Sequence, residues 1–293
     1  PGPWDEDIVW LCQDQPVSRA PAAPDQRAFP YGGTYLLHGP NSRAIMRCTD
    51  YRSRPSHADQ LHVDLWIRGQ NIAIDAGTYL YSGEGMWRNG LARTSVHNSV
   101  VVDGLDQMKM LTRFTWTNWS HGKVLRHTEN SWQAEHDGYK RLADPVLHRR
   151  TVMSVGRDRW LVVDHLIANQ PHHYALHWLL ADGEYAVQEQ SPANDVLWSP
   201  SDGNPSDSSI RIRVGVVNSS GTFSIVRADP NSTRGWRSRY YGEKEPAISV
   251  LLETEHASSI FWSFFGFGDD LITLNANMLT INSQEIDLTH LNK

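Results

Sequence analysis

The stretch Leu61-His62-Val63-Asp64-Leu65-Trp66, followed by Arg68-Gly69-Gln70-Asn71 and Ile72-Ala73-Ile74-Asp75, carries the clearest secondary-structure signal in the sequence. Apolar and polar residues alternate through its first half, and this period of two sends Leu61, Val63 and Leu65 to one face of a strand. The glycine-containing segment between the two runs predicts a turn. We therefore expect a β-hairpin, and if Arg68 pairs with Asn71 then Asp75 lies opposite Asp64.

Similar short runs recur along the rest of the chain, separated by Gly, Asn and Asp. Such spacing of strands and turns is typical of a large antiparallel β-sandwich. No stretch combines a long 3.6-residue period with caps at both ends, so the few helices should be short. The predicted fold class is therefore all-β, a two-sheet antiparallel sandwich. Further strands are expected at Ser99–Val102, His148–Val155, Trp160–Ile167, Tyr174–Leu180, Ile210–Val217, Thr222–Val226, Ala247–Thr254 and Ser258–Phe265, and a surface loop at Ser201–Ser209.

Length and proline content suggest one sandwich domain with a lead-in. The 293 residues are 40% hydrophobic and 20% charged, which is enough apolar material for a sizeable core. Prolines at positions 1, 3, 16, 21, 24 and 30 break both helix and central strand, so residues 1–30 are expected to be extended and residues 31–293 to form the domain. The start at Pro1-Gly2-Pro3 resembles neither a Met start nor a signal peptide, which favours a fragment or a processed product.

Charge and cysteine content exclude several classes of partner. The net charge is −6 and the Lys and Arg residues are spread along the chain, so nucleic acid is not an expected partner. The chain contains no run of about 18 apolar residues, so no membrane-spanning helix is predicted. Cys12 and Cys48 permit one disulfide but no thiolate metal site, and they leave the compartment open. The twelve Trp residues could pack in the core or present flat faces to sugars.

His57, Asp75 and His97 stand where predicted strands begin or end. Imidazole nitrogen and carboxylate oxygen together suit zinc and would leave a fourth coordination position. Their separations match no local metal motif, so the alternative is that each is an ordinary hydrogen-bonded polar group. A second metal site among His172, His173 and His177 has outward-facing strand histidines as its alternative.

Three strings together resemble the central motif of the heparinase II/III family of polysaccharide lyases. They are Ser56-His57-Ala58-Asp59, Asp75-Ala76-Gly77-Thr78-Tyr79 and His97-Asn98-Ser99-Val100-Val101-Val102-Asp103-Gly104. The family joins an N-terminal α-helical toroid to a C-terminal β-sandwich and cleaves uronic-acid polysaccharides by β-elimination. From about Tyr31 to its end, this chain resembles the sandwich half, so the resemblance implies a missing toroid as partner, residues 1–30 as the remnant of a linker, and a periplasmic or secreted location.

The resemblance also implies roles for individual residues. His57, Asp75 and His97 correspond to family ligands of a mainly structural zinc ion. Some family members place another histidine, which contacts substrate, two residues before the first ligand; here that position is Pro55. The Gly235-Trp236-Arg237-Ser238-Arg239-Tyr240-Tyr241-Gly242 stretch resembles a family segment and predicts a turn near the cleft.

β-Elimination requires a neutralised uronate carboxylate, a base for the C5 proton and an acid for the departing oxygen. Tyr79 is the local candidate for proton transfer, and Arg88 and Arg93 are candidates for binding the carboxylate. Asn98 and Trp87 are further candidates for substrate contacts. The alternatives are that Tyr79 is a packed strand-end aromatic and that the arginines are solvated loop charges.

The leading interpretation is therefore the sandwich half of a lyase acting on an acidic polysaccharide, inactive alone if the toroid supplies the remaining groups. The first alternative is a non-catalytic carbohydrate-binding or structural sandwich whose metal only holds loops. The second is a zinc-dependent glycan hydrolase, which the open fourth coordination position would allow.

Overall fold

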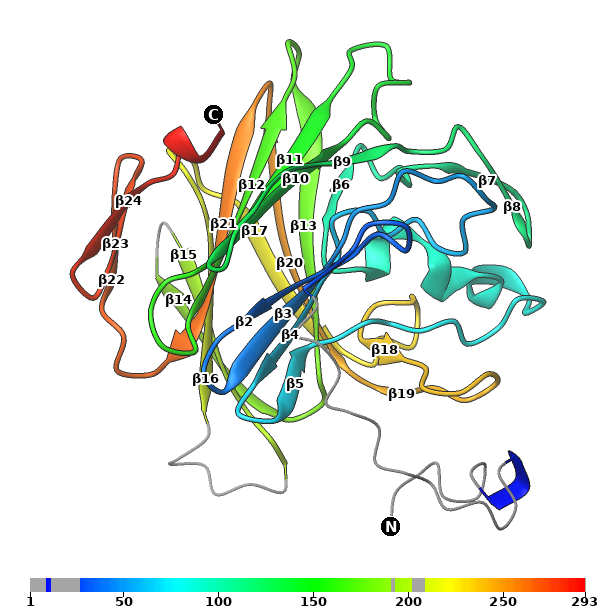
Figure 1. The fold of residues 1–293 in the computed structure, drawn as a ribbon, viewed down its shortest axis with the longest axis horizontal. Coiled ribbons are helices and arrows are strands. Elements are labelled where there is room, and N and C mark those ends of the chain that lie inside the picture. The colour runs from blue at the N-terminus through cyan, green and yellow to red at the C-terminus, as the bar shows by residue number, and fades with distance from the viewer. Residues whose placement is uncertain (1–8, 12–26, 191–192, 202–208, 293) are drawn as a thin grey trace.

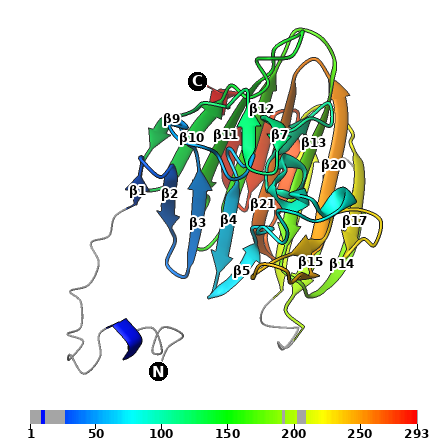
Figure 2. The same cartoon turned by 90° about the vertical axis from the view of Figure 1, so that its right-hand side faces the viewer.

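Two large antiparallel sheets face each other in the computed structural model, as Figure 1 and Figure 2 show from two sides. The structure describes residues 9–11, 27–190, 193–201 and 209–292. The expected sandwich is confirmed. Five of the six lead-in prolines, at positions 1, 3, 16, 21 and 24, and most of the predicted loop at Ser201–Ser209 lie outside the described residues, so the domain boundary at residue 30 stays a prediction.

The first sheet has nine strands and the second has eight. In spatial order, the first sheet contains β1 (Ala28–Phe29), β2 (Thr34–His38), β3 (Ser42–Arg47), β4 (Val63–Ile67), β5 (Gln70–Ala73), β13 (His172–Leu180), β20 (Ile248–His256) and β17 (Thr222–Arg227), with β6 (Val100–Val102) also pairing with β13. The second contains β14 (Glu184–Gln190), β15 (Ala193–Ser199), β16 (Ile210–Val216), β21 (Ser259–Phe267), β12 (Trp160–Ile167), β11 (Leu147–Ser154), β10 (Ser131–His136) and β9 (Gly122–His127).

Smaller elements flank these sheets. A three-stranded sheet contains β22 (Ile272–Asn275), β23 (Met278–Ile281) and β24 (Gln284–Asp287). Two-stranded ribbons pair β7 (Lys109–Thr112) with β8 (Thr115–Thr117) and β18 (Trp236–Arg237) with β19 (Glu245–Pro246). Short 3-10 helices are η1 (Gly85–Trp87), η2 (Gly90–Ala92), η3 (Thr94–Val96) and η4 (His290–Asn292). The expectation of few, short helices is confirmed in the part of the chain that is described.

The main core fills the space between the two large sheets. Inward side chains from both sheets contribute to it because strand residues alternate between faces. The rings of Trp178 on β13 and Phe265 on β21 meet across the sandwich, edge to face, with centroids 4.8 Å apart. Trp132 and Trp160 are also fully buried. In these positions the tryptophans serve packing.

Each large sheet is also covered on its outer face, so the molecule has more than two layers. Leu161 and Trp262 of the second sheet pack against Leu279 and Ile286 of the β22–β24 sheet. On the opposite side, loops and the helices η1 to η3 cover the first sheet, and Leu91 and Val96 pack near Leu179. Figure 1 shows β22–β24 at the left and these loops at the right. The loop layer at the right carries His57, Asp75 and His97.

The predicted hairpin is present, but its register differs from the expected one. Ile67 pairs with Gln70, so the two turn residues are Arg68 and Gly69, with φ of 52° and 80°. Positive φ at both central positions matches the type I′ turn that suits the twist of paired strands. A bulge then shifts the pairing between Leu65 and Trp66. Asp75 therefore lies beyond the end of β5, rather than opposite Asp64.

The predicted strands are all present, with ends that shift by up to two residues, and the alternation in β4 is confirmed because Val63 and Leu65 are both 1% exposed. Cys48 is a buried free thiol, and its potential partner Cys12 is not among the described residues. The outward-facing assignment of the β13 histidines is wrong for His177, which is fully buried because the loop layer covers this face of β13.

Candidate functional site

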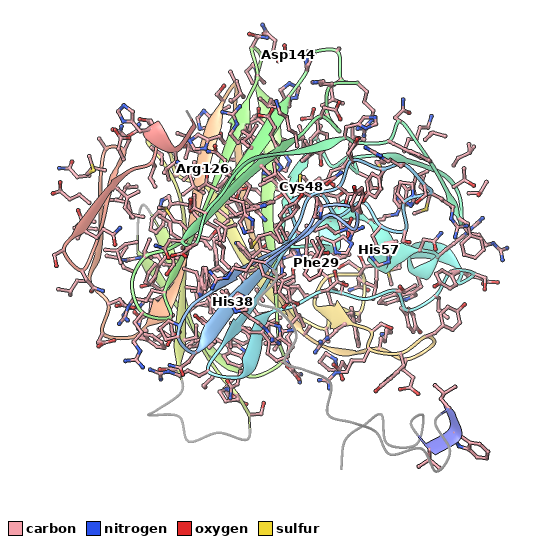
Figure 3. All side chains as sticks on the ribbon, in the orientation of Figure 1. Phe29, His38, Cys48, His57, Arg126 and Asp144 are labelled. Atoms are coloured by element: carbon pink, nitrogen blue, oxygen red, sulfur yellow. The ribbon has the colours of Figure 1, made fainter. Side chains whose placement is uncertain are left out.

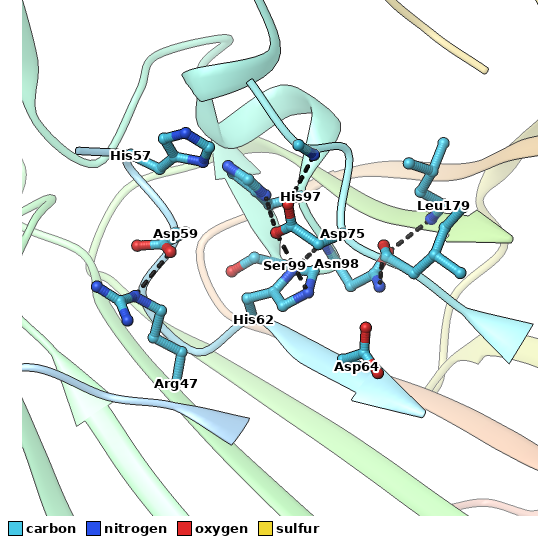
Figure 4. A network of polar contacts seen from close by, with 12 residues as sticks. Arg47, His57, Asp59, His62, Asp64, Asp75, His97, Asn98, Ser99 and Leu179 are labelled. Carbon is cyan, nitrogen blue, oxygen red and sulfur yellow. Dashed lines mark hydrogen bonds and ion pairs between the residues drawn. The ribbon is translucent and has the colours of Figure 1, made fainter. Parts of the chain in front are cut away.

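Three loops bring His57, Asp75 and His97 together over the outer face of the first sheet. His57 belongs to the loop between β3 and β4, Asp75 follows β5, and His97 follows η3. One potential ligand atom from each lies within 4.8 Å of the others. Figure 4 shows the three side chains converging, and Figure 3 places His57 on the side of the loop layer. Among the described residues, this is the one such group of three that could hold a metal ion.

The Asp75 carboxylate faces several histidines. Its Oδ2 atom is 3.3 Å from His97 Nδ1 and 3.7 Å from His62 Nε2, while Oδ1 accepts a 2.7 Å hydrogen bond from the Gly77 amide. Burial would raise the pKa of Asp75, but His97, His62 and His57 together lower it well below its ordinary value. The carboxylate is therefore charged at neutral pH and can act as an oxygen ligand.

The His97 ring has the surroundings expected of a metal ligand, because it is buried and forms no hydrogen bond. Its side chain is fully buried, and both ring nitrogens lack a hydrogen-bond partner because the approach to Asp75 is poorly aligned. Leaving buried polar atoms unpaired is costly, so such atoms in a native structure call for an explanation. Asp75 raises the pKa of His97 even though burial opposes it. A cation in place of the proton would satisfy one nitrogen, and the nitrogen and oxygen donor set suits zinc.

His62, which the motif analysis did not select, supports Asp75 from below. The Asn98 amide donates a 3.1 Å hydrogen bond to His62 Nδ1, so the proton of the neutral ring lies on Nε2, facing Asp75. Burial lowers the pKa of His62 to about 4, which keeps the ring neutral at pH 7. His62 Nε2 thus points toward a candidate ligand, 3.7 Å from its Oδ2 atom, without forming a hydrogen bond. Its position in an alternating strand gave no sign of this.

The expected contact between Asn98 and substrate is wrong for this structure. Asn98 is fully buried, and its side-chain amide donates to the carbonyl oxygens of Val63 at 2.8 Å and Ile74 at 3.1 Å. Its Oδ1 accepts a 2.6 Å hydrogen bond from the Leu179 amide (Figure 4). Both polar atoms of the Asn98 side chain are thus hydrogen-bonded to backbone groups. Asn98 therefore joins β4, the end of β5 and β13 beneath the site.

Tyr79 and Trp87 lie at the edge of the site in contact with each other. Their rings meet edge to face with centroids 5.3 Å apart. The Tyr79 backbone has φ of 60°, and its amide donates to Ser238 Oγ while its carbonyl accepts from the Gly242 amide. The 235–242 stretch therefore holds the Tyr79 loop, and its expected place near a cleft stays a prediction. The catalytic role of Tyr79 and the substrate role of Trp87 stay predictions.

One small cavity is lined by a candidate metal ligand, and a second shares Arg113 with it. One, of about 170 Å³, is lined by His57, Arg54, Arg113 and the aromatic rings of Tyr81 and Phe114. Arg54 also lies over the Phe114 ring, 5.3 Å from its centroid. Sequence reasoning missed both arginines of this cavity, although Arg54 lies only two residues before the Ser56–Asp59 string.

The expected carboxylate-binding residues Arg88 and Arg93 line the second cavity, of about 230 Å³, which Arg113 also borders. Arg93 is already paired, since its Nη1 lies 2.7 Å from Asp106 Oδ2, whereas Arg88 is exposed. A larger cavity of about 600 Å³ is lined by Arg68, Arg159 and Phe267 and contains none of the candidate site residues. The arginines that share a cavity with a candidate ligand are therefore Arg54 and Arg113.

The cluster at His172 is built differently from the metal candidate. Its Nδ1 lies 2.7 Å from Asp103 Oδ2 and its Nε2 lies 3.3 Å from Asp144 Oδ2, so both nitrogens have partners. His177 likewise uses its ring nitrogens on the His97 carbonyl and Ser249 Oγ. The second metal site is not assembled among these described histidines.

Within the described residues, no helix has the length and apolar character needed to cross a membrane.

Comparison with known proteins adds a family context. A family model described as "Heparinase II/III-like, C-terminal" matches residues 21–263. The heparin-sulfate lyase of Bacteroides stercoris is 32% identical over 128 residues, covering 42% of this chain and 17% of the relative. The heparin-sulfate lyase of Pedobacter heparinus is 28% identical over 148 residues, covering 48% and 20%.

A similar fold is found among solved structures. Heparan sulfate lyase HepC from Pedobacter heparinus matches with a TM-score of 0.65 at 16% identity, covering 92% of this chain and 44% of that chain. At this identity the likeness shows the fold alone. The chain thus spans less than half the length of each of these relatives.

Proposed function

This chain belongs to the heparinase II/III-like family, whose C-terminal domain it matches, and from that premise we propose that it is the sandwich part of a polysaccharide lyase. The proposed reaction is β-elimination on a uronic-acid-containing polysaccharide. The two curated relatives are heparin-sulfate lyases, so heparan sulfate is the first substrate to test. Because the matches cover at most 20% of those relatives, the activity is proposed for a protein that also contains a helical domain.

The observation that carries the proposal is the position of a basic, aromatic-lined cavity beside the candidate ligands. Arg54 and Arg113 border it together with His57. An arginine can bind a carboxylate through two parallel hydrogen bonds, which lowers the cost of charge that develops when the neighbouring C–H loses its proton. The Tyr81 and Phe114 rings offer apolar faces to the sugar. These residues fit a short segment of acidic sugar.

We propose that His57, Asp75 and His97 hold a zinc ion that mainly stabilises the loops. When bound, zinc supplies a positive charge and fixed ligand geometry. The three residues come from three separate loops, so joining them restricts the movement of each loop relative to the others. The elimination chemistry itself is assigned to protein groups: Arg54 and Arg113 bind the acidic sugar, and Tyr79 is the local candidate for moving a proton.

The test is to incubate heparan sulfate and other uronate polymers with the chain, alone and joined to a heparinase-type helical domain. Absorbance of the unsaturated product is expected from the joined protein. Arg113→Ala should reduce the rate at least tenfold, whereas the exposed Arg157→Ala, in the distant cavity, should not. Release of reducing ends without absorbance would favour a hydrolase, and binding without cleavage would favour a carbohydrate-binding sandwich; either result would contradict the lyase.

A further inference from the structure

A charged pair lies inside the core beneath the site. Arg150 on β11 and Asp164 on β12 are both fully buried, and the guanidinium binds the carboxylate at two points, Nε to Oδ1 at 2.6 Å and Nη2 to Oδ2 at 2.9 Å. Burial would raise the pKa of Asp164, but Arg150 and His148 lower it to about 2. Removing two charges from water is costly, and apolar replacements of such pairs are often no less stable. Stability alone therefore does not explain this pair.

The hydrogen bonds on the Asp164 side form a complete chain. The Gly138 amide donates to His136 Nδ1, so the His136 proton lies on Nε2 and faces His148 Nδ1 at 3.1 Å. The His148 proton then lies on Nε2, 2.6 Å from Asp164 Oδ1. Each group has one orientation that satisfies its neighbours, and this holds the carboxylate in place.

The other side of Arg150 reaches the loops that carry the site. Its Nη1 donates to the carbonyl oxygen of Leu61 at 2.7 Å and to that of Asn98. Leu61 directly precedes His62, and Asn98 directly follows His97. Leu61 has φ of 61°, a conformation that a branched residue adopts only when its surroundings impose it. One guanidinium thus fixes both loops from the opposite sheet.

We infer that Arg150, held by Asp164, is a positioning residue for the His62, Asp75 and His97 constellation. It acts through the carbonyl oxygens of Leu61 and Asn98, which are the chain neighbours of His62 and His97. Holding these carbonyls fixes the backbone that carries the two histidine side chains. Because Asn98 also donates its amide to His62 Nδ1, the same contact supports the orientation of His62 toward Asp75. The inference rests on the proposed function where it concerns zinc, and on the hydrogen bonds alone where it concerns the loops.

The test compares two double variants of the full chain. Arg150→Met with Asp164→Asn removes both charges and leaves an amide oxygen for His148. The control, Arg149→Met with Glu135→Gln, removes a neighbouring arginine–carboxylate pair that joins β10 and β11 on the other face. The two readouts are zinc affinity, by competition with a chromophoric chelator, and hydrogen exchange of the His62 and Asn98 amides in metal-free protein.

The Arg150 pair variant should bind zinc about 10 to 100 times more weakly than the parent, the loss typical of removing support around a ligand. Its Asn98 amide should exchange faster than in the parent, while the exchange of β20 amides should change little. In the control variant, neither zinc affinity nor Asn98 exchange should change much. Arg150→Lys keeps a positive charge beside Asp164 and so serves as a second variant in case the double variant does not fold. Its loss of zinc affinity should be smaller but present, because one ammonium group cannot bind the carboxylate and both carbonyl oxygens.

Each outcome separates this inference from the proposed function. If the parent binds no zinc but the Asn98 amide exchanges faster in the Arg150 variants than in the parent, the zinc proposal fails and the positioning role stands. Parental zinc affinity and parental Asn98 exchange in both Arg150 variants would overturn the positioning role, even if their melting temperatures fall.

Discussion

Replacing Gly77 by alanine should be more damaging than the same change at Gly69. Both glycines have strongly positive φ, 74° and 80°, so either alanine costs about 1 to 2 kcal/mol from backbone strain. A Cβ at Gly69 meets nothing within 4 Å, whereas a Cβ at Gly77 would lie 1.9 Å from the Ser238 carbonyl oxygen. The two positions therefore share the strain and differ in the steric overlap.

The overlap at Gly77 cannot be relieved by a side-chain rotation. The Ser238 amide donates to the Ala76 carbonyl at 2.8 Å, and its hydroxyl donates to the Tyr240 carbonyl at 2.9 Å. The backbone of the 235–242 stretch must move, at a cost typical of overpacking, about 1 to 3 kcal/mol. Gly77→Ala should thus cost about 2 to 5 kcal/mol in total, against about 1 to 2 kcal/mol for Gly69→Ala.

Urea unfolding of the parent and both variants measures these losses, provided that the three m-values agree. Zinc affinity is the second readout, because movement of the Asp75–Tyr79 loop should weaken binding in Gly77→Ala alone. Equal losses of unfolding free energy in the two variants would refute the proposed close approach between this loop and Ser238.

Three further predictions concern the proposed metal site, Tyr79 and pH. Zinc at 100 times its Kd should raise the unfolding free energy by about 2.7 kcal/mol, and a thermal melt should show that His97→Ala abolishes this gain. If His97→Ala instead melts like the zinc-bound parent but loses turnover, the metal is catalytic. Tyr79→Phe should leave unfolding unchanged and, in a protein with the helical domain, lower product absorbance at least tenfold; unchanged turnover would remove Tyr79 from the chemistry. Burial lowers the pKa of His172, but Asp103 and Asp144 raise it above its ordinary value overall, so its stabilisation is present below about pH 6.5 and is lost as pH rises through the folded pKa. Urea unfolding should therefore show a larger loss for His172→Gln at pH 6 than at pH 9, with His173→Gln as control, and equal losses at the two pH values would contradict the assignment.

Much of the sandwich could be predicted because long strands with one buried face show their period in the sequence. The residues of β4 follow this pattern, whereas β12 is buried on both faces and is marked instead by a short, mainly apolar run; both strands are present as expected. The β22–β24 sheet was not predicted, because its strands have four residues each and their pairing with the outer face of the second sheet is a tertiary contact.

The candidate ligands could be selected because resemblance preserves the order and identity of short strings. His62 and Arg150 could not be found in this way, since their roles depend on backbone groups distant in sequence. His62 faces Asp75 because of the amide of Asn98, 36 residues away. Arg149 and Arg150 are adjacent charges on one strand, so one must point inward, but the pattern does not indicate which.

The order in which the chain is synthesised has a consequence for the loop layer. The proposed zinc ligands leave the ribosome before the groups that hold them, because Arg150 follows Asn98 by 52 residues and Ser238 follows Tyr79 by 159. At about 5 to 20 residues per second, the second interval lasts roughly 8 to 32 seconds. During translation the three ligands are thus present on loops without their final supports. If the site binds zinc as proposed, its ligands therefore reach their final geometry only after the C-terminal half of the chain has been made.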